Sequence, residues 1–204
     1  HYQKFVNDCK LFNRVQNVEA KLGNLGRLSR SFHSSFQILS KMNLTHSAAS
    51  HWVIKWSGAI APKGRVLDVA SGSGRHVRFM LDRGFSLLAV DLDISGIEDL
   101  RGQPGIDILQ TDLENRPWPF ADSLFDGIVV TNYLHRPLFP SLITSLKPGG
   151  IVIYETFAEG NEAFGRPSNP DFLLRRGELL EVTKGITTVL AYEDIYVDKP
   201  KPAL

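Results

Sequence analysis

Short apolar runs alternate with amphipathic segments along most of this chain. The runs rich in Val, Ile and Leu, which we expect to be buried strands, are 65–69, 86–90, 106–110, 127–131 and 151–156. The segments whose apolar residues recur at helical spacing are 75–82, 94–100 and 137–146. Strands and helices that alternate in this way predict a parallel sheet with right-handed crossover helices on both faces, a doubly wound α/β fold.

Further elements flank this alternating region. Apolar residues at helical spacing predict a helix over 47–60, which Pro62-Lys63-Gly64 would end before the first strand. A helix over 172–182 and a strand over 187–196 follow the last alternating unit. Near the start of the chain, mixed three- and four-residue apolar spacings predict some helix over 5–22.

Composition narrows the class of protein. The 204 residues suit one domain, and 43% hydrophobic with 22% charged residues is ordinary for a soluble globular chain. No run approaches the roughly 18 apolar residues that a membrane span needs. The single cysteine, Cys9, excludes an internal disulfide and a cysteine-rich zinc site, and it favours a reducing compartment. We therefore expect a cytoplasmic protein that is not embedded in a membrane.

Charge is distributed unevenly along the chain. Residues 1–41 hold seven Lys or Arg against two acids, whereas residues 42–204 hold 16 basic and 20 acidic residues. We predict a basic N-terminal extension over 1–41, which would be a tag, an organelle leader or a docking tail, and a catalytic domain over 42–204. A leader would place the protein in an organelle matrix. With a tag or a variable extension, Met42 would instead be the natural start. The mildly acidic body disfavours nucleic acid as a partner.

A glycine-rich turn, Ser71-Gly72-Ser73-Gly74, follows the first strand, and Asp91 closes the second. This arrangement is typical of a nucleoside site in a doubly wound sheet. The third glycine of a dinucleotide-binding loop is replaced by Val77, which disfavours a nicotinamide oxidoreductase. Asp68 would also repel a diphosphate, and it suits a ligand that carries an ammonium or a sulfonium.

Five motifs occur in a fixed order over residues 64–155. They are Val66 to Gly74, Ala89-Val90-Asp91, Gln110-Thr111-Asp112-Leu113, Phe125 to Val130 and Leu146-Lys147-Pro148-Gly149-Gly150. In this order they resemble the successive motifs of class I S-adenosylmethionine-dependent methyltransferases. The following segment, from Tyr154 to Leu180, resembles the small-molecule branch related to tellurite-resistance and thiopurine methyltransferases.

The resemblance implies a Rossmann-like, mostly parallel sheet and S-adenosyl-L-methionine as the cofactor. The related fold adds a seventh, antiparallel strand, and too few residues follow 196 to form it, so we expect that either the chain is cut short or this strand is missing. The helix over 47–60 would cover the cofactor. The expected cofactor-binding residues are Asp68, Ala70, Gly72, Gly74, Arg75, Asp91, Leu92, Asp112, Leu113, Thr131 and Asn132.

Individual roles follow from side-chain chemistry. The two oxygens of Asp91 suit the vicinal ribose hydroxyls, and Asp68 would face the methionine ammonium or only cap the turn. Leu92 would lie under the adenine, and Asp112 would accept from its exocyclic amine or be a solvated loop acid. Arg75, with His76 beside it, would pair with a carboxylate or form a surface pair on an exposed turn.

Candidate catalytic residues follow the fourth strand of the pattern, at the edge where open α/β sheets bind ligands. Thr131-Asn132-Tyr133 replaces the Asn/Asp-Pro-Pro-Tyr of enzymes that methylate adenine or glutamine amines, which disfavours those targets. We expect Tyr133 to orient the acceptor and His135 to act as general base, or His135 to be structural. Arg136 would anchor an anion.

The segment 157–167 is long and contains glycines and aromatics, which is typical of a lid. We expect Phe164 and Arg166 to bind the substrate, the alternative being an ordered surface loop. No histidine pair has metal-ligand spacing, so no metal is expected.

These patterns predict an S-adenosylmethionine-dependent methyltransferase that acts on a small-molecule acceptor by in-line displacement. The alternative is a non-catalytic S-adenosylmethionine-binding regulatory module with residues 1–41 as its docking tail. The acceptor, the atom that is methylated and the oligomeric state stay open.

Overall fold

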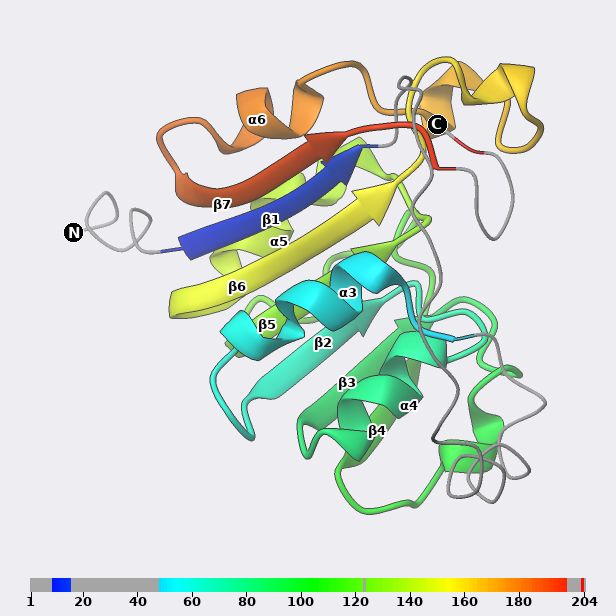
Figure 1. Ribbon diagram of the computed structural model, residues 1–204. Helices are drawn as coiled ribbons and strands as arrows, with labels where there is room; N and C mark the ends of the chain where they lie inside the picture. The colour runs from blue at the N-terminus through cyan, green and yellow to red at the C-terminus, as the bar shows by residue number, and fades with distance from the viewer. Residues whose placement is uncertain (1–8, 16–47, 123, 198–202, 204) are drawn as a thin grey trace, which may run out of the picture.

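The computed structural model describes residues 9–15, 48–122, 124–197 and 203. Its strands form one seven-stranded sheet in the order β4-β3-β2-β5-β6-β1-β7, and every neighbouring pair is parallel (Figure 1). The strands are β1 Cys9–Val15, β2 Arg65–Val69, β3 Ser86–Asp91, β4 Ile106–Gln110, β5 Phe125–Thr131, β6 Leu146–Thr156 and β7 Thr187–Asp194. The predicted doubly wound α/β architecture is confirmed.

Helices cover both faces of the sheet. They are α3 His51–Trp56, α4 Arg75–Asp82, α5 Phe139–Thr144 and α6 Glu178–Thr183. Helices α3 and α4 lie on the face toward the viewer in Figure 1, and α5 lies on the opposite face. Trp52, Val53, Val77 and Met80 anchor the first pair in one buried cluster, whereas α5 and α6 contribute to a second cluster around Phe125. The sheet therefore carries an apolar core on each side, as burial of its Val- and Ile-rich strands requires.

Local patterns located the central elements well. The predicted boundaries of β2, α4 and β4 agree with the structure residue for residue. The helices expected over 137–146 and 172–182 are shorter than predicted. The first is a 3-10 turn, η3 (Arg136–Leu138), followed by α5, and the second begins only after Gly177, which has a φ of +74°.

The helix predicted over 94–100 is wrong. This segment contains turns and one 3-10 helix, η2 (Glu98–Leu100). Side chains compete here for the backbone donors, because Asp93 Oδ1 accepts from the N–H of Ser95 at 2.9 Å. Gly96 also packs tightly against the glycine turn, since a Cβ on it would lie 2.5 Å from the carbonyl oxygen of Gly72.

The N-terminal region corrects two further expectations. Residues 9–15 form β1 rather than a helix, and β1 pairs with β6 on one side and with β7 on the other. The sheet therefore has a seventh strand, which is parallel and comes from the basic extension, so the boundary at residue 41 does not separate these residues from the fold. The other predictions for residues 1–41, including the leader and the docking tail, and the proposed start at Met42 lie outside the described residues.

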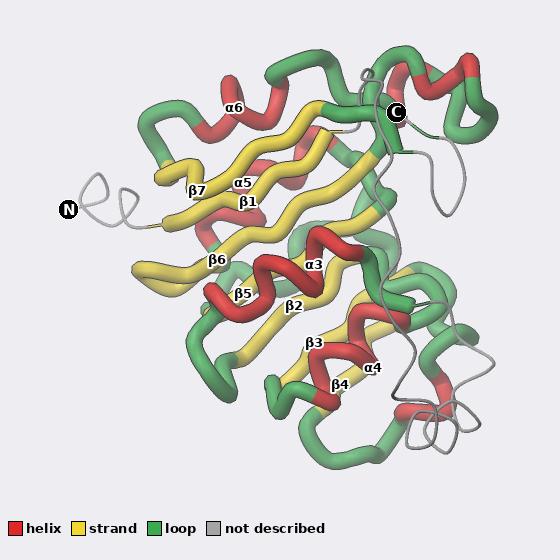
Figure 2. The backbone as a smooth tube through the Cα atoms, in the orientation of Figure 1, coloured by secondary structure: helices red, strands yellow, loops and turns green. Residues whose placement is uncertain are grey.

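The parallel arrangement brings the carboxyl ends of the strands to one edge of the sheet. The connections that follow β2, β3, β4, β5 and β6 gather at this edge, where Figure 2 shows loops between the ends of the strands. The segment 157–175 also lies at this end of the molecule (Figure 1). Open α/β sheets bind ligands outside this edge. Within the described part of the chain, no helix has both the length and the apolar composition to cross a membrane.

Candidate active site

The turn between β2 and α4 holds three residues in the left-handed region, with φ of +55° at Ala70, +53° at Gly72 and +74° at Gly74. A Cβ on Gly74 would collide with the side chain of Ile97, whereas a Cβ on Gly72 would meet nothing within 4 Å. Gly74 is therefore fixed by packing. Gly72 leaves open space beside the backbone, where a ligand can approach.

Asp91 is attached to this turn. Its Oδ2 accepts from the backbone N–H of Gly72 at 2.7 Å, and its Oδ1 accepts from the N–H of Asp93 at 2.9 Å. A carboxylate oxygen accepts more than one hydrogen bond, so both oxygens can still accept hydrogen bonds from the two hydroxyl groups of a diol. The structure thus brings Asp91 and the glycine turn together as predicted.

Asp68 is buried in the middle of the site, with 1% of its surface exposed. Neither carboxylate oxygen has a hydrogen-bond partner among the described residues, so Asp68 does not cap the turn there. Burial raises its pKa to about 8, the charge of Arg75 lowers it and the charge of Asp91 raises it further. The buried Oγ of Ser71 also has no partner among these residues. Such uncompensated polar atoms favour a bound cationic ligand.

His76 is buried rather than part of an exposed surface pair with Arg75. The backbone N–H of Ser50 donates to its Nε2 at 3.2 Å, which leaves the ring proton on Nδ1, 3.1 Å from the hydroxyl oxygen of Thr131. Burial, helped by the charge of Arg75, lowers the pKa of His76 to about 3. The neutral imidazole therefore joins the start of α3, where Ser50 is also the N-cap, to the end of β5.

The expected adenine contacts lie after β3 and β4. Leu92 is 65% exposed although it directly follows Asp91, and the side-chain amide of Gln110 donates to its carbonyl oxygen at 2.9 Å. Leu113 is buried. Asp112 caps its own turn by accepting from the backbone N–H groups of residues 114 and 115 and from the side-chain amide of residue 115. These hydrogen bonds, of which the side-chain bond has the largest effect, lower the pKa of Asp112. Asp112 is therefore engaged within its own loop, as the alternative interpretation expects.

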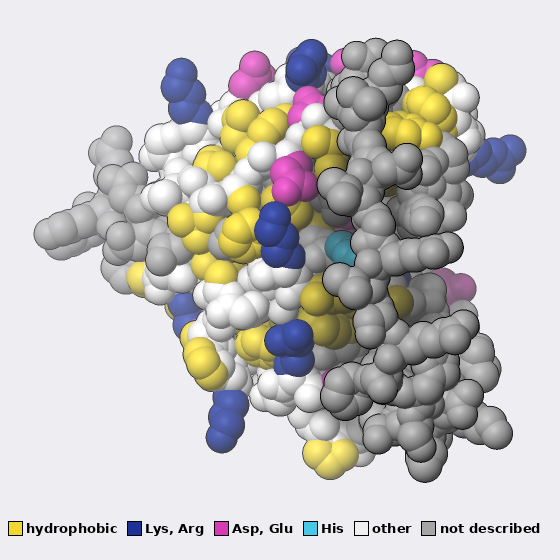
Figure 3. All heavy atoms as spheres, viewed as in Figure 1, with side chains coloured by type: hydrophobic (Ala, Val, Ile, Leu, Met, Phe, Trp, Pro, Cys, Tyr) yellow, Lys and Arg dark blue, Asp and Glu magenta, His cyan; other side chains and the backbone are white. Residues whose placement is uncertain are grey.

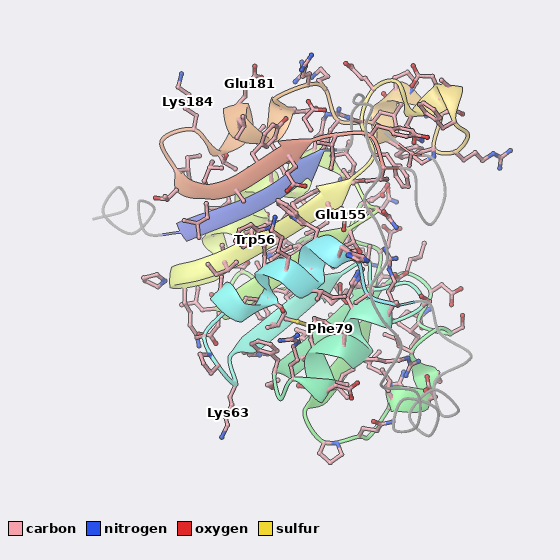
Figure 4. The ribbon with its side chains drawn as sticks, in the orientation of Figure 1. Trp56, Lys63, Phe79, Glu155, Glu181 and Lys184 are labelled. Carbon is pink, nitrogen blue, oxygen red and sulfur yellow. The ribbon has the colours of Figure 1, made fainter. Side chains whose placement is uncertain are left out.

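A pocket of ≈ 190 Å³ opens beyond β5. Its wall is mainly apolar and aromatic, and it consists of Glu114, Asn132, Tyr133, Leu134, Thr156, Phe157, Pro167 and Phe172. Asn132 has a φ of +54°, and its N–H donates at 2.8 Å to the carbonyl oxygen of Glu155, which Figure 4 shows at the end of β6. A mainly apolar wall with a few polar groups is typical of a small-molecule site.

Two ionisable residues line the pocket, Tyr133 and Glu114. Burial, followed by the charge of Glu114, raises the pKa of Tyr133 well above its ordinary value, so the phenol stays protonated. Glu114 Oε2 also lies 4.0 Å from Nδ1 of His135. Glu114 was missed from sequence, although it lies two residues after Asp112 on the same loop. Of the expected catalytic pair, Tyr133 lies in the wall and His135 lies against Glu114.

In the segment 157–167, Phe164 and Arg166 do not line the pocket as expected. The ring of Phe164 packs against Tyr196 at a centroid distance of 5.2 Å, and Arg166 is exposed. From this segment and the residues that follow it, Phe157, Pro167 and Phe172 line the pocket instead. The segment is also ordered by 3-10 turns, η4 (Asn161–Ala163) and η5 (Pro170–Phe172). Figure 3 shows hydrophobic side chains exposed at this end of the molecule.

Arg136, expected as an anion anchor, is occupied within the protein. It forms an ion pair with the buried carboxylate of Glu178 and donates to two backbone carbonyl oxygens. Among the described residues, no three His, Cys, Asp or Glu side chains are grouped so that they could hold a metal ion.

The segment that carries the site is similar to a known family of domains. Residues 66–150, which include the glycine turn, Asp91, Asp112 and β5, match the family model described as a methyltransferase domain. Over these residues the chain is similar to methyltransferase domains, and its parallel sheet has the Rossmann-like fold. The residues present fit S-adenosyl-L-methionine, since Asp68 offers an uncompensated buried carboxyl and Gly72 leaves open space.

Comparison with individual proteins supports the same class. The demethylmenaquinone methyltransferase of Renibacterium salmoninarum is 29% identical over 129 residues, which are 60% of this chain and 53% of that protein. YqeM of Bacillus subtilis is 29% identical over 126 residues, 55% of this chain and 50% of that protein. The chain thus spans about half the length of these curated relatives. A TehB-like S-adenosylmethionine-dependent methyltransferase from Corynebacterium glutamicum shares the fold, with a TM-score of 0.51 and 20% identity over 74% of this chain and 79% of that one.

Proposed function

We propose that this protein transfers the methyl group of S-adenosylmethionine to a small-molecule acceptor bound in the pocket beside Tyr133. The observation that carries the proposal is the position of this pocket next to the cofactor-side acids. Glu114 in its wall lies two residues after Asp112, and Asn132 in its wall directly follows Thr131, whose hydroxyl lies 3.1 Å from Nδ1 of His76. A pocket of ≈ 190 Å³ has room for a small acceptor group.

On the side of the site with the glycine turn and Asp91, which we call the cofactor side, residues of this chain would bind and orient the cofactor. Asp91 would accept from the ribose hydroxyls, Asp68 would compensate the methionine ammonium, and the exposed Leu92 would cover one face of the adenine. When bound, S-adenosylmethionine supplies an electrophilic methyl group on a sulfonium. Thr131, held by His76, fixes the end of β5 between the cofactor side and the pocket.

On the acceptor side, positioning supplies most of the catalysis, because methyl transfer is an in-line displacement without a covalent intermediate on the enzyme. Tyr133 remains protonated and donates a hydrogen bond, whereas Glu114 and His135 can take a proton from a nitrogen or oxygen nucleophile. A sulfur, selenium or tellurium nucleophile needs no base. This last class agrees with the proposed place in the tellurite-resistance and thiopurine branch. A reducing, cytoplasmic location remains part of the proposal.

The test is calorimetric titration with S-adenosylmethionine and S-adenosylhomocysteine, followed by an assay of S-adenosylhomocysteine formation with small thiols, amines and phenols. Micromolar binding together with turnover of at least one acceptor class is the expected result. Absence of binding would overturn the proposal. Binding without turnover of any acceptor would support the alternative, a regulatory module, and it would overturn the catalytic role.

A further inference from the structure

Arg136 connects two walls of the pocket. Its Nε and Nη2 donate to the two carboxylate oxygens of Glu178, at 2.6 and 3.0 Å. Its Nη1 donates to the carbonyl oxygen of Asp171 at 2.8 Å, and Nη2 also donates to that of Leu173 at 2.9 Å. The planar guanidinium thus uses donors on all three nitrogens, an arrangement that the point charge of lysine cannot reproduce.

The two carbonyl oxygens flank one residue. Phe172 lies between Asp171 and Leu173 in sequence, and its ring lines the pocket although it is 49% exposed. Arg136 itself follows the wall residues Tyr133 and Leu134 at the end of β5. The guanidinium therefore fixes the backbone on both sides of Phe172 to the segment that carries Tyr133.

The other half of this connection is the buried carboxylate of Glu178, whose side chain is 2% exposed. Burial alone would raise its pKa, but the hydrogen bonds from Arg136 and from the N–H of Arg175 hold the pKa below its ordinary value. The carboxylate is consequently ionised at neutral pH. A buried charge of this kind is costly without its partner, so Glu178 holds Arg136 in place and Arg136 holds Glu178.

A second set of bonds holds the same segment from its other side. The N–H of Leu174 donates to the carbonyl oxygen of Phe157 at 2.9 Å, and the N–H of Glu159 donates to the carbonyl oxygen of Leu174 at 3.0 Å. Phe157 is itself part of the pocket wall. The spacing between the aromatic walls at Phe157 and Phe172 therefore depends on both sets of bonds.

We propose that Arg136 is a positioning residue for the acceptor, which it serves through Phe172 and without touching the substrate. This inference rests on the proposed function. The Arg136–Glu178 pair sets the width of the acceptor pocket and leaves the cofactor side, which is built from the glycine turn and Asp91, unaffected.

The test is Arg136→Lys in the full chain. The matched control is Arg101→Lys, because Arg101 forms a bidentate pair of the same kind with Glu98, at 2.6 and 2.9 Å, on an exposed surface. We expect the Michaelis constant for the acceptor to rise about tenfold or more in Arg136→Lys, while the Kd for S-adenosylhomocysteine stays within about twofold. Arg101→Lys should match the wild type in both quantities.

A second readout does not depend on turnover. Amide hydrogen exchange should accelerate in residues 169–174 of Arg136→Lys and stay unchanged in residues 70–76. An unchanged acceptor Michaelis constant in an active variant, or a parallel loss of S-adenosylhomocysteine affinity, would overturn the positioning role. Absence of turnover by the wild-type protein would instead overturn the proposed function, and this inference with it.

Discussion

The backbone N–H of Gly72 donates to Oδ2 of Asp91 at 2.7 Å, which joins two residues that are 19 positions apart in sequence. The bond holds the carboxylate at the end of β3 against the open space beside the glycine turn. Because the acid is fixed before a ligand binds, little conformational freedom has to be lost when it accepts a diol.

Replacement of Asp91 should therefore weaken cofactor binding. We expect Asp91→Ala to cost about 1–3 kcal/mol, the scale of a lost charge-assisted hydrogen-bond partner, which corresponds to a roughly 5- to 150-fold higher Kd for S-adenosylhomocysteine. Asp91→Asn should lose less, because an amide oxygen can still accept from Gly72. Calorimetric titration measures both variants. Asp107→Ala, an exposed acid on β4, is the control, and equal affinity of Asp91→Ala and this control would contradict the assigned role.

The raised pKa of Asp68 predicts an unusual pH dependence of stability. The folded protein retains a proton on Asp68 up to about pH 8, whereas the unfolded chain loses it near pH 3.8. Between these values the unfolded state binds fewer protons, so the free energy of unfolding falls as pH rises, with a limiting slope of about 1.4 kcal/mol per pH unit. Below about pH 6.5 His76 contributes an opposite slope, because burial lowers its pKa from 6.5 to about 3 in the folded protein. Urea denaturation between pH 6.5 and 8 should therefore show the fall, and Asp68→Asn should remove it.

Cofactor binding tests the same residue independently. An ammonium beside Asp68 would lower its pKa, so binding of S-adenosylhomocysteine near pH 7 should release a proton. Titrations in buffers of different ionisation enthalpy measure that proton. Equal proton release by the wild type and Asp68→Asn would show that another group is responsible.

On the acceptor side, the role proposed for Tyr133 is that of a hydrogen-bond donor, because its raised pKa keeps the phenol protonated. Tyr133→Phe should lower kcat/KM by about 10- to 100-fold, the effect of one lost hydrogen bond in a buried site, and leave the Kd for S-adenosylhomocysteine unchanged. The pH profile of the remaining activity should keep its shape up to pH 9, since the phenol does not titrate there. A lost alkaline limb in the variant would instead identify Tyr133 as a base.

The local parts of this site were readable from sequence, and the parts set by packing were not. The turn at Gly72 and the acid at Asp91 follow from apolar runs and glycines that act within a few residues. His76 was misjudged as a possible surface residue because its burial depends on α3, whose Ser50 lies 26 positions away. The helix predicted over 94–100 was wrong for a similar reason, since Gly96 packs against the glycine turn.

The acceptor pocket shows the same limit. Phe164 and Arg166 were reasonable choices within a loop of the right composition, but packing on Tyr196 and the contacts of Arg136 decide which residues of that loop face inward. The strand at 9–15 was equally inaccessible to local patterns, because its partners Ile151 and Thr187 lie far along the chain. Long-range pairing of this kind overrides helical spacing.

Glycine can be needed in a turn for its backbone conformation or for the space that it leaves for a ligand. A comparison of Gly72 with Gly84 distinguishes these two reasons. Both have positive φ, +53° and +82°, and a Cβ on either would meet nothing within 4 Å. Gly72→Ala and Gly84→Ala should therefore carry a similar strain of about 1–2 kcal/mol, which thermal or urea denaturation measures. Only Gly72→Ala places its methyl group at the proposed cofactor surface, so only this variant should lose affinity for S-adenosylhomocysteine, by about tenfold or more. Ala70, which adopts a φ of +55° in the same turn, indicates that the fold tolerates an alanine in this conformation. An equal loss of affinity in both variants would mean that strain, and not the open space at Gly72, controls binding.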